Sequence, residues 1–262
     1  MQGDGAQTSE DAVLGGRLLL RQPLQGHRVG HDAILLAASC PARPGESLID
    51  LGAGVGAAGL AVAKRVPALT VTLVEIDAVL TALARENAAR NGLADRARAI
   101  CLDVTAPGSA FDAAGLKSGE ADRVITNPPF NAAHNPSPNP KRKLAHVAGE
   151  DAFAALAPWA GAAAMLLRSA GTLTLIWRAD GLEAVLASLG ATGFGGVTVL
   201  PVHPKPQAAA IRVLVAAIKG SNAPLSLLPG LVLADAAGRP SAEAEAVLRD
   251  GAVLPLGQAG AA

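Results

Sequence analysis

The segment Asn127-Pro128-Pro129-Phe130 places an amide, two prolines and an aromatic ring directly after the apolar run RVIT. Proline fixes its own φ and holds the residue before it in extended geometry, so the segment is predicted to be rigid. The Asn127 side-chain oxygen and the Pro128 carbonyl can then accept hydrogen bonds from one planar amine, while Phe130 packs against the ring that bears it. We therefore interpret the four residues as catalytic, with an amino group on a planar molecule as the acceptor.

A plain turn is the alternative interpretation of this segment, because Asn and Pro are common in loops. Its place in the chain favours catalysis, since it ends the fourth of several expected parallel strands, and ligands bind at that edge of such sheets. No strong general base is required, because rigid placement of the donor and the acceptor can supply most of the rate acceleration.

A second candidate site is the sequence LIDLGAGVGAAGL, in which Gly52, Gly54 and Gly56 lie between an apolar strand and a helix. Glycine lets the backbone approach a ligand closely, and the helix that follows offers free N–H groups at its N-terminus. This is the arrangement of a nucleotide-binding first turn. The glycines alone would also suit a merely structural turn, so the neighbouring acidic residues decide the interpretation.

Acidic residues end three successive expected strands, with Asp50 in SLID, Glu75 in TLVE and Asp103 in AICLD. In a parallel sheet these ends meet at one edge, so the three carboxylates are predicted to face the same crevice. Glu75 follows the glycines by about 20 residues, the spacing at which a carboxylate binds the hydroxyls of a ribose. The acids could instead be helix N-caps or solvated turn residues. Together with the glycines, they favour a nucleotide-like ligand.

Short apolar runs alternate with helical stretches from Ser47 onward, which is typical of parallel βαβ construction. We expect helices at 57–66 and 78–92, and seven strands at 47–51, 69–75, 97–103, 123–127, 171–177, 196–202 and 210–218. The last two strands are joined by HPKPQA, which is too short for a helical crossover, so they should pair antiparallel. The predicted fold is therefore α/β, with a seven-stranded, mostly parallel, Rossmann-like sheet, helices on both faces and the last strand antiparallel.

The two ends of the chain are expected to be accessory to this sheet. The first ten residues are taken as loose, and a short strand at Leu18 to Leu20 precedes a helix that begins near Asp32. The tail after Ser221 carries four prolines and is interpreted as a small cap on the sheet. We therefore divide the chain into an N-terminal strand and helix extension at 1–46 that closes the ligand site, a sheet domain at 47–220 and a C-terminal cap at 221–262.

Composition excludes several classes of protein. Lys plus Arg equals Asp plus Glu at 22 each, so no global basic field attracts a polyanion and any nucleic-acid contact must be local. The two cysteines, Cys40 and Cys101, fit no CxxC or disulfide framework and indicate buried thiols in a reducing compartment. We find no secretory signal and no uninterrupted apolar run of about 18 residues. The chain is expected to be cytoplasmic, with no membrane partner.

The glycine loop and the acids together resemble the S-adenosylmethionine site of class I methyltransferases more than the dinucleotide site of a dehydrogenase. In that family the glycine loop lies under the methionyl part of the cofactor, an acid like Glu75 binds the ribose, and one like Asp103 meets the adenine amine. The segment 127–130 is similar to the (N/D/S)PP(Y/F) motif of members that methylate planar amino groups, where such acceptors free the nitrogen lone pair for attack on the sulfonium methyl. The resemblance implies S-adenosylmethionine as the cofactor, bound by Asp50, Gly52, Gly54, Gly56, Glu75, Asp103 and Asn127.

Several enzymes share this motif, including adenine-N6 enzymes acting on DNA or RNA, guanine-N2 enzymes acting on ribosomal RNA and glutamine-N5 enzymes acting on release factors. The stretch LRQPLQGHRVGHDAILLAA, the loop SPNPKRKLAHVAGED, the turn VHPKP and the tail RPSAEAEAVLRD resemble the bacterial tRNA (adenine-N6)-methyltransferase family that modifies valine tRNA. That resemblance implies RNA, in particular tRNA, as the partner, and implies that Gln22, Arg28 and Asp32 help to close the cofactor site. A guanine or protein glutamine acceptor and a non-catalytic nucleotide-binding module stay open as alternatives.

Lys141, Arg142 and Lys143, with His146 close behind, form a dense basic run in the loop that follows Phe130. They could contact RNA phosphates beside the substrate entrance, or they could form an ordinary solvated charged surface. The pair His27 and His31 has no evident third ligand, so no metal is expected. The zero net charge leaves open a homodimer or a partner protein that would add basic surface.

Overall fold

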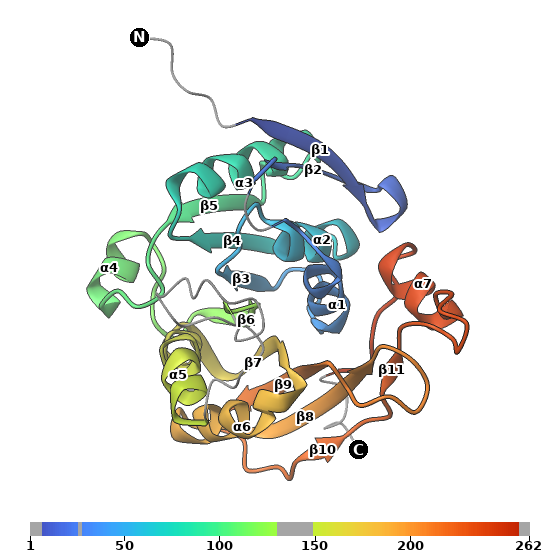
Figure 1. The fold of residues 1–262 in the computed structure, drawn as a ribbon. Helices are drawn as coiled ribbons and strands as arrows, with labels where there is room; N and C mark the ends of the chain where they lie inside the picture. The colour runs from blue at the N-terminus through green and yellow to red at the C-terminus, as the bar shows by residue number, and fades with distance from the viewer. Residues whose placement is uncertain (1–6, 26–27, 130–148, 257–262) are drawn as a thin grey trace, which may run out of the picture.

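One central sheet with helices on both faces organises the computed structural model (Figure 1). The structure describes residues 7–25, 28–129 and 149–256. The long strands of the sheet are β3 (Ser47–Leu51), β4 (Thr70–Glu75), β5 (Ala97–Cys101), β6 (Ala121–Thr126), β7 (Leu167–Arg178), β8 (Phe194–His203) and β9 (Arg212–Lys219). They lie in the order β8-β9-β7-β6-β3-β4-β5, and β9 pairs antiparallel with both β7 and β8. The predicted fold class is confirmed.

Two short strands extend the sheet beyond the seven that the sequence predicts. The strands β10 (Ser226–Leu227) and β11 (Leu231–Val232) both pair parallel with β8, so the sheet has nine strands within the described residues. A strand of two residues is too short to show the period of two on which strand prediction depends. The proline-rich tail therefore adds backbone pairing at the edge of the sheet.

Helices form a layer on each face of the sheet and bury two apolar cores. The helices are α1 (His31–Ser39), α2 (Ala57–Arg65), α3 (Ala78–Arg90), α4 (Gly108–Ala113), α5 (Gly149–Leu166), α6 (Leu182–Ala191) and α7 (Ala242–Leu248), with short 3-10 turns η1 (Leu14–Gly16) and η3 (Ala179–Gly181). One core contains side chains of α1, α2, α3 and α7, and the other contains side chains of α4, α5 and α6.

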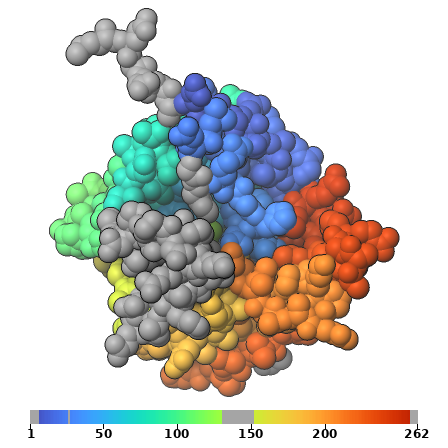
Figure 2. Space-filling model, viewed as in Figure 1, coloured from blue at the N-terminus to red at the C-terminus, as the bar shows by residue number. Residues whose placement is uncertain are grey.

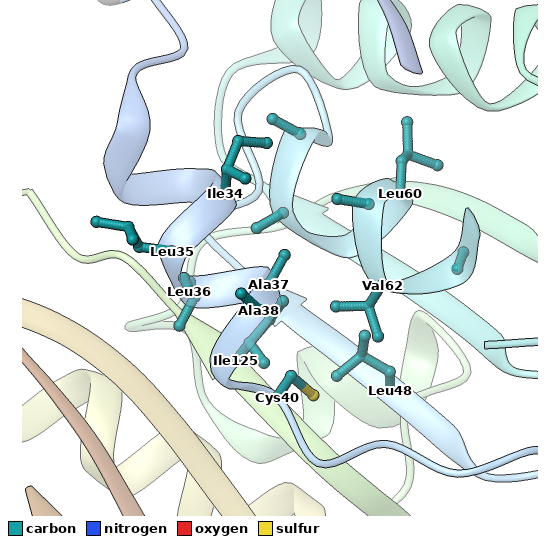
Figure 3. Close-up of a cluster of buried hydrophobic side chains, with 14 of the residues drawn as sticks. Ile34, Leu35, Leu36, Ala37, Ala38, Cys40, Leu48, Leu60, Val62 and Ile125 are labelled. Carbon is teal, nitrogen blue, oxygen red and sulfur yellow. The ribbon is translucent and has the colours of Figure 1, made fainter. Parts of the chain in front are cut away.

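Side chains along the strands alternate between these two cores, as the pleat of a strand requires. In β3, Leu48 faces the core of α1 and α2, whereas Ile49 faces the core of α5 and α6. Figure 3 shows Leu48 and Ile125 in the first core, near Leu36 and Val62. Full burial of such a side chain contributes about 1.5–3 kcal/mol, so both faces of the sheet are stabilised by helices.

The N-terminal part forms a separate antiparallel hairpin of β1 (Thr8–Val13) and β2 (Leu18–Pro23). The prediction that the first ten residues are loose is wrong from Thr8 onward. The sequence TSEDAV has too few apolar residues to predict a strand, and it is ordered through its pairing with β2. In β2, by contrast, Leu18 and Leu20 are buried and alternate with exposed residues.

The tail packs on the N-terminal half of the molecule as well as on β8. Helix α7 begins at the N-cap Ser241, whose side chain accepts a hydrogen bond from the Ala244 N–H, and α7 contacts α1. Figure 2 shows the red tail beside the blue N-terminal part on this face. Val247 and Leu254 share one core with Leu48. All three predicted parts of the chain contribute side chains to that core, and the division into three parts stays a prediction.

The two cysteines differ in environment. Cys40 is fully buried, and this burial raises the pKa of its thiol to about 11. Cys101 is exposed, so the prediction that both thiols are buried is wrong for this residue, which ends the edge strand β5. Among residues 7–25, 28–129 and 149–256, no helix combines the length and apolar character needed to cross a membrane.

Candidate functional site

A cavity of about 290 Å³ lies where β3 and β6 end, at the carboxyl edge of the sheet. Its walls are the segment 28–33 that leads into α1, the glycine loop 52–55, Asp50 and Asn127. Two other recesses contain none of the predicted site residues. One, of about 300 Å³, lies beside α1, α2 and α7, and the other, of about 410 Å³, lies at the amino edge of the strands. The chemistry of its walls therefore makes the first cavity the candidate site.

The glycine loop joins β3 to α2 through left-handed backbone conformations. Gly52 has φ +72° and Gly56, which caps α2, has φ +88°. The N–H groups of Gly52 and Ala53 both donate to the Val74 carbonyl of β4 at 2.9 Å, which fixes the loop to the sheet. A Cβ atom at Gly52 would lie 2.8 Å from the ring of Trp159, so packing as well as conformation requires glycine there.

The Asp50 carboxyl group is 2% exposed and lies in the wall of the cavity. Its Oδ2 atom accepts a hydrogen bond from the Gly59 N–H at 2.8 Å. Burial raises the pKa of Asp50 to about 7, the hydrogen bond from Gly59 lowers it, and the nearby Glu75 carboxylate raises it. A positively charged ligand in the cavity would favour the ionised form of this group.

Glu75, at the end of β4, is 8% exposed and contacts the glycine loop directly. Its Oε2 atom accepts from the Gly54 N–H at 2.8 Å and its Oε1 atom accepts from the Asp77 N–H at 3.0 Å. Each carboxylate oxygen has a further lone pair, so both can still accept a hydrogen bond from a hydroxyl group. The structure thus places Glu75 behind the loop, and a ribose contact remains a prediction.

Asp103 follows β5 and adopts a local turn. Its Oδ1 atom accepts hydrogen bonds from both the N–H and the hydroxyl of Thr105, each at 2.8 Å. It is not among the residues that line the cavity. These contacts match the alternative of a turn residue, and the predicted contact with an adenine amine stays a prediction.

Asn127 lies directly after β6, and its side-chain oxygen is the least satisfied atom of the site. The Oδ1 atom is buried and has no hydrogen-bond partner among the described residues. A buried acceptor without a donor costs about 1–3 kcal/mol, and Asn127 is one of the residues that line the cavity. Pro128 is buried and Pro129 is exposed. The segment therefore presents an acceptor where a ligand with a polar hydrogen would satisfy it.

Five predicted residues lie outside the described part of the chain, namely Phe130, Lys141, Arg142, Lys143 and His146. His27 also lies outside it, whereas His31 lines the cavity. Within the described ranges, no group of three His, Cys, Asp or Glu side chains could hold a metal ion.

Arg28 and Asp32, which the family resemblance implies at the cofactor site, both line the cavity, and each is held by an ion pair. Arg28 Nη2 donates to Asp11 Oδ2 at 2.6 Å, and Arg212 Nε donates to Asp32 Oδ2 at 3.0 Å. The residue Gln22 is 3% exposed and bonds the same Asp11 oxygen. Asp11 and Arg212 were not predicted from the sequence, because neither is a sequence neighbour of the residue that it holds: Asp11 is 17 residues from Arg28, and Arg212 is 180 residues from Asp32.

Trp159 of α5 is a third residue at the site that was not predicted from the sequence. Its ring lies over Gly52, and it lines with Thr126 and Pro128 a void of about 10 Å³. The side chain therefore packs between the glycine loop and the Asn127-Pro128 segment. The signal that could have found it is scarcity, since the chain has only two Trp residues.

Comparison with known proteins gives one family model, described as the methyltransferase small domain, which matches residues 27–188. A tRNA1(Val) (adenine(37)-N6)-methyltransferase of Phocaeicola vulgatus is 30% identical over 189 residues, which cover 72% of this chain and 76% of the relative. A protein of the same description from Enterobacter is 31% identical over 150 residues, which cover 57% of this chain and 58% of the relative.

Solved structures show the same fold. A crystal structure from Agrobacterium tumefaciens, described as a predicted O-methyltransferase, has a TM-score of 0.70 at 30% identity and covers 85% of this chain and 98% of its own. An S-adenosylmethionine-dependent O-methyltransferase of Thermotoga maritima has a TM-score of 0.53 at 17% identity over 76% of this chain and 69% of its own, which is a likeness of fold alone.

Proposed function

The chain belongs to the methyltransferase small domain family, and we propose that it transfers a methyl group from S-adenosylmethionine to the exocyclic N6 amine of adenine in tRNA. The observation that carries the proposal is the buried Oδ1 atom of Asn127, which has no partner among the described residues and belongs to a residue that lines a cavity beside a glycine loop. The relatives described as tRNA adenine-N6 enzymes support the choice of RNA and of adenine.

The charge of the cavity walls suits the cofactor. When bound, S-adenosylmethionine supplies an electrophilic methyl group on a positively charged sulfur. Asp50 places an ionisable carboxyl group in the wall, and a cationic ligand would hold it in its charged form. Gly54 lines the cavity while its N–H donates to Glu75, which brings the ribose-binding candidate to the back of the same wall.

The acceptor end of the site is Asn127 and Pro128. The Asn127 oxygen and the Pro128 carbonyl would accept the two hydrogens of one amino group, so the amine would be held with its lone pair directed at the methyl donor. Two fixed acceptors suit an amino group better than a hydroxyl group, which has one hydrogen. We therefore assign nitrogen as the acceptor atom, although the Agrobacterium relative is described as a predicted O-methyltransferase.

The role of the loop at 130–148 follows from its position in the sequence after Pro129. Phe130 would stack on the target base, and a single unstacked base needs no longer aromatic platform. Lys141, Arg142 and Lys143, with His146, would contact phosphates near that base. A homodimer would add basic surface to a chain of zero net charge, and it stays a prediction.

Methyl transfer from labelled S-adenosylmethionine to total unmodified RNA, followed by identification of the modified nucleoside, tests the proposal. We expect N6-methyladenosine in the tRNA fraction with the wild type and at least a 100-fold lower rate with Asn127→Ala. That variant should still bind the cofactor, because the glycine loop, Asp50 and Glu75 stay in place and the main effect of the lost Asn127 oxygen falls on the acceptor. An active Asn127→Ala protein would contradict the mechanism.

A second acceptor class is separated by the same experiment. If RNA stays unlabelled while the protein binds S-adenosylmethionine, the acceptor must be sought among proteins, where a glutamine side chain offers the same planar amide nitrogen. Label in N2-methylguanosine would instead assign the guanine chemistry.

A further inference from the structure

The strand β2 pairs with β1 along one edge, and its other edge lies against α3. On that edge the backbone groups of Arg21 are bound by a side-chain amide: Asn87 Oδ1 accepts from the Arg21 N–H at 2.7 Å and Asn87 Nδ2 donates to the Arg21 carbonyl at 3.0 Å. Asn91 bonds the N–H and carbonyl of Leu19 in the same way, at 3.0 and 2.7 Å. Asn87 in α3 and Asn91 at its C-cap thus bond the edge of β2 in place of a neighbouring strand. Figure 1 shows α3 beside the hairpin.

The Asn87 amide also reaches the glycine loop. Its Nδ2 atom donates to the Val55 carbonyl at 3.0 Å, and Val55 lines the cavity. Asn87 is 0% exposed, and its bond to Val55 is buried, whereas its bonds to Arg21 are partly buried. One buried side chain ties the N-terminal hairpin to the loop at the candidate site.

A second set of bonds leads from the hairpin to the part of the cavity wall formed by Arg28 and Val29. Gln22, at the end of β2, accepts from the Val29 N–H at 2.9 Å and donates to Asp11 Oδ2 at 2.6 Å. The same Asp11 oxygen accepts from Arg28 Nη2 at 2.6 Å. Arg28 and Val29 both line the cavity. The position of that wall is therefore set by residues of β1 and β2 that do not themselves line it.

We propose that Asp11, Gln22 and Asn87 are positioning residues that hold Arg28 and the start of α1 against the glycine loop, so that the β1–β2 hairpin sets the affinity for the cofactor. The inference rests on the proposed function in so far as the ligand is S-adenosylmethionine. Arg28 offers five N–H donors, and with one of them held by Asp11 the others can reach an anionic group of the cofactor such as its carboxylate. Loss of the Asp11 bond would release Arg28 and leave the chemistry at Asn127 unchanged.

The test compares Asp11→Ala, Asp11→Asn and Glu10→Gln. Glu10 is a matched control, because it lies on the same strand and pairs with Arg90 of α3 rather than with a cavity residue. We expect Asp11→Ala to raise the dissociation constant and the KM for S-adenosylmethionine at least fivefold with kcat changed less than twofold. Asp11→Asn keeps an acceptor oxygen and should restore most of the affinity, and Glu10→Gln should bind as the wild type does. Equal affinity of Asp11→Ala and the wild type would overturn the proposal.

Hydrogen exchange of the free protein separates this inference from the proposed function. The Val29 N–H donates to Gln22, and Gln22 is held in turn by Asp11. Exchange of the Val29 N–H should therefore be at least tenfold faster in Asp11→Ala and unchanged in Glu10→Gln. If the wild type binds no S-adenosylmethionine, the proposed function fails while this measurement still reports on the hairpin. Unchanged exchange at Val29 in Asp11→Ala would show that Asp11 does not position this wall.

Discussion

Asp50→Asn is expected to stabilise the protein by an amount that depends on pH. Burial raises the pKa of the Asp50 carboxyl group from 3.8 to about 7. Because the folded protein holds this proton more tightly than the unfolded chain does, the free energy of unfolding falls as pH rises between those two values. The difference corresponds to at most about 4 kcal/mol above pH 7. Asn carries no charge and can still accept from the Gly59 N–H, so the substitution should remove this cost.

Urea unfolding of the wild type and Asp50→Asn from about pH 5 to about pH 8 measures the effect, since other titrating groups cancel in the difference. The advantage of Asp50→Asn should grow by about 2–3 kcal/mol over that range. S-adenosylmethionine should reduce the pH dependence of the wild type, because the cationic cofactor favours the ionised carboxylate. A constant difference across the range would mean that Asp50 ionises as an exposed carboxyl group does, and the reasoning from burial would be refuted.

Gly52→Ala should lower the free energy of unfolding by about 2–4 kcal/mol, because it adds left-handed strain and places a Cβ atom 2.8 Å from Trp159. Gly54→Ala, with φ +57° but nothing within 4 Å of its Cβ, should cost about 1–2 kcal/mol, and equal losses in urea unfolding would show that Trp159 gives way. Arg212→Gln should weaken binding of S-adenosylmethionine by roughly fivefold, because Asp32 loses its ion-pair partner beside the cavity. Calorimetry checks this, and unchanged affinity would show that the ion pair contributes only to the fold.

The sheet could be predicted from the sequence because each long strand carries its own local signal. Alternation of side chains between two cores and turn residues at the strand ends are visible without knowledge of the rest of the chain. The hairpin strand β1 and the edge strands β10 and β11 lack that signal, since each depends on pairing with a distant segment. Their order is a property of the assembled molecule, and a single sequence does not display it.

The site, like the sheet, could be predicted only in part from the sequence, and the contrast between Glu75 and Asp103 shows why. Glu75 ends β4 and Asp103 follows β5 at the same edge of the sheet, so the sequence pattern treats them alike. In the structure, Glu75 bonds the glycine loop whereas Asp103 bonds its own turn through Thr105. Strand periodicity can place a residue at the edge of a sheet, but the direction of its side chain depends on which backbone N–H groups lie within reach. The residues Asp11 and Asn87 extend this argument, because they contribute to the cavity only through hydrogen bonds between segments that the fold brings together.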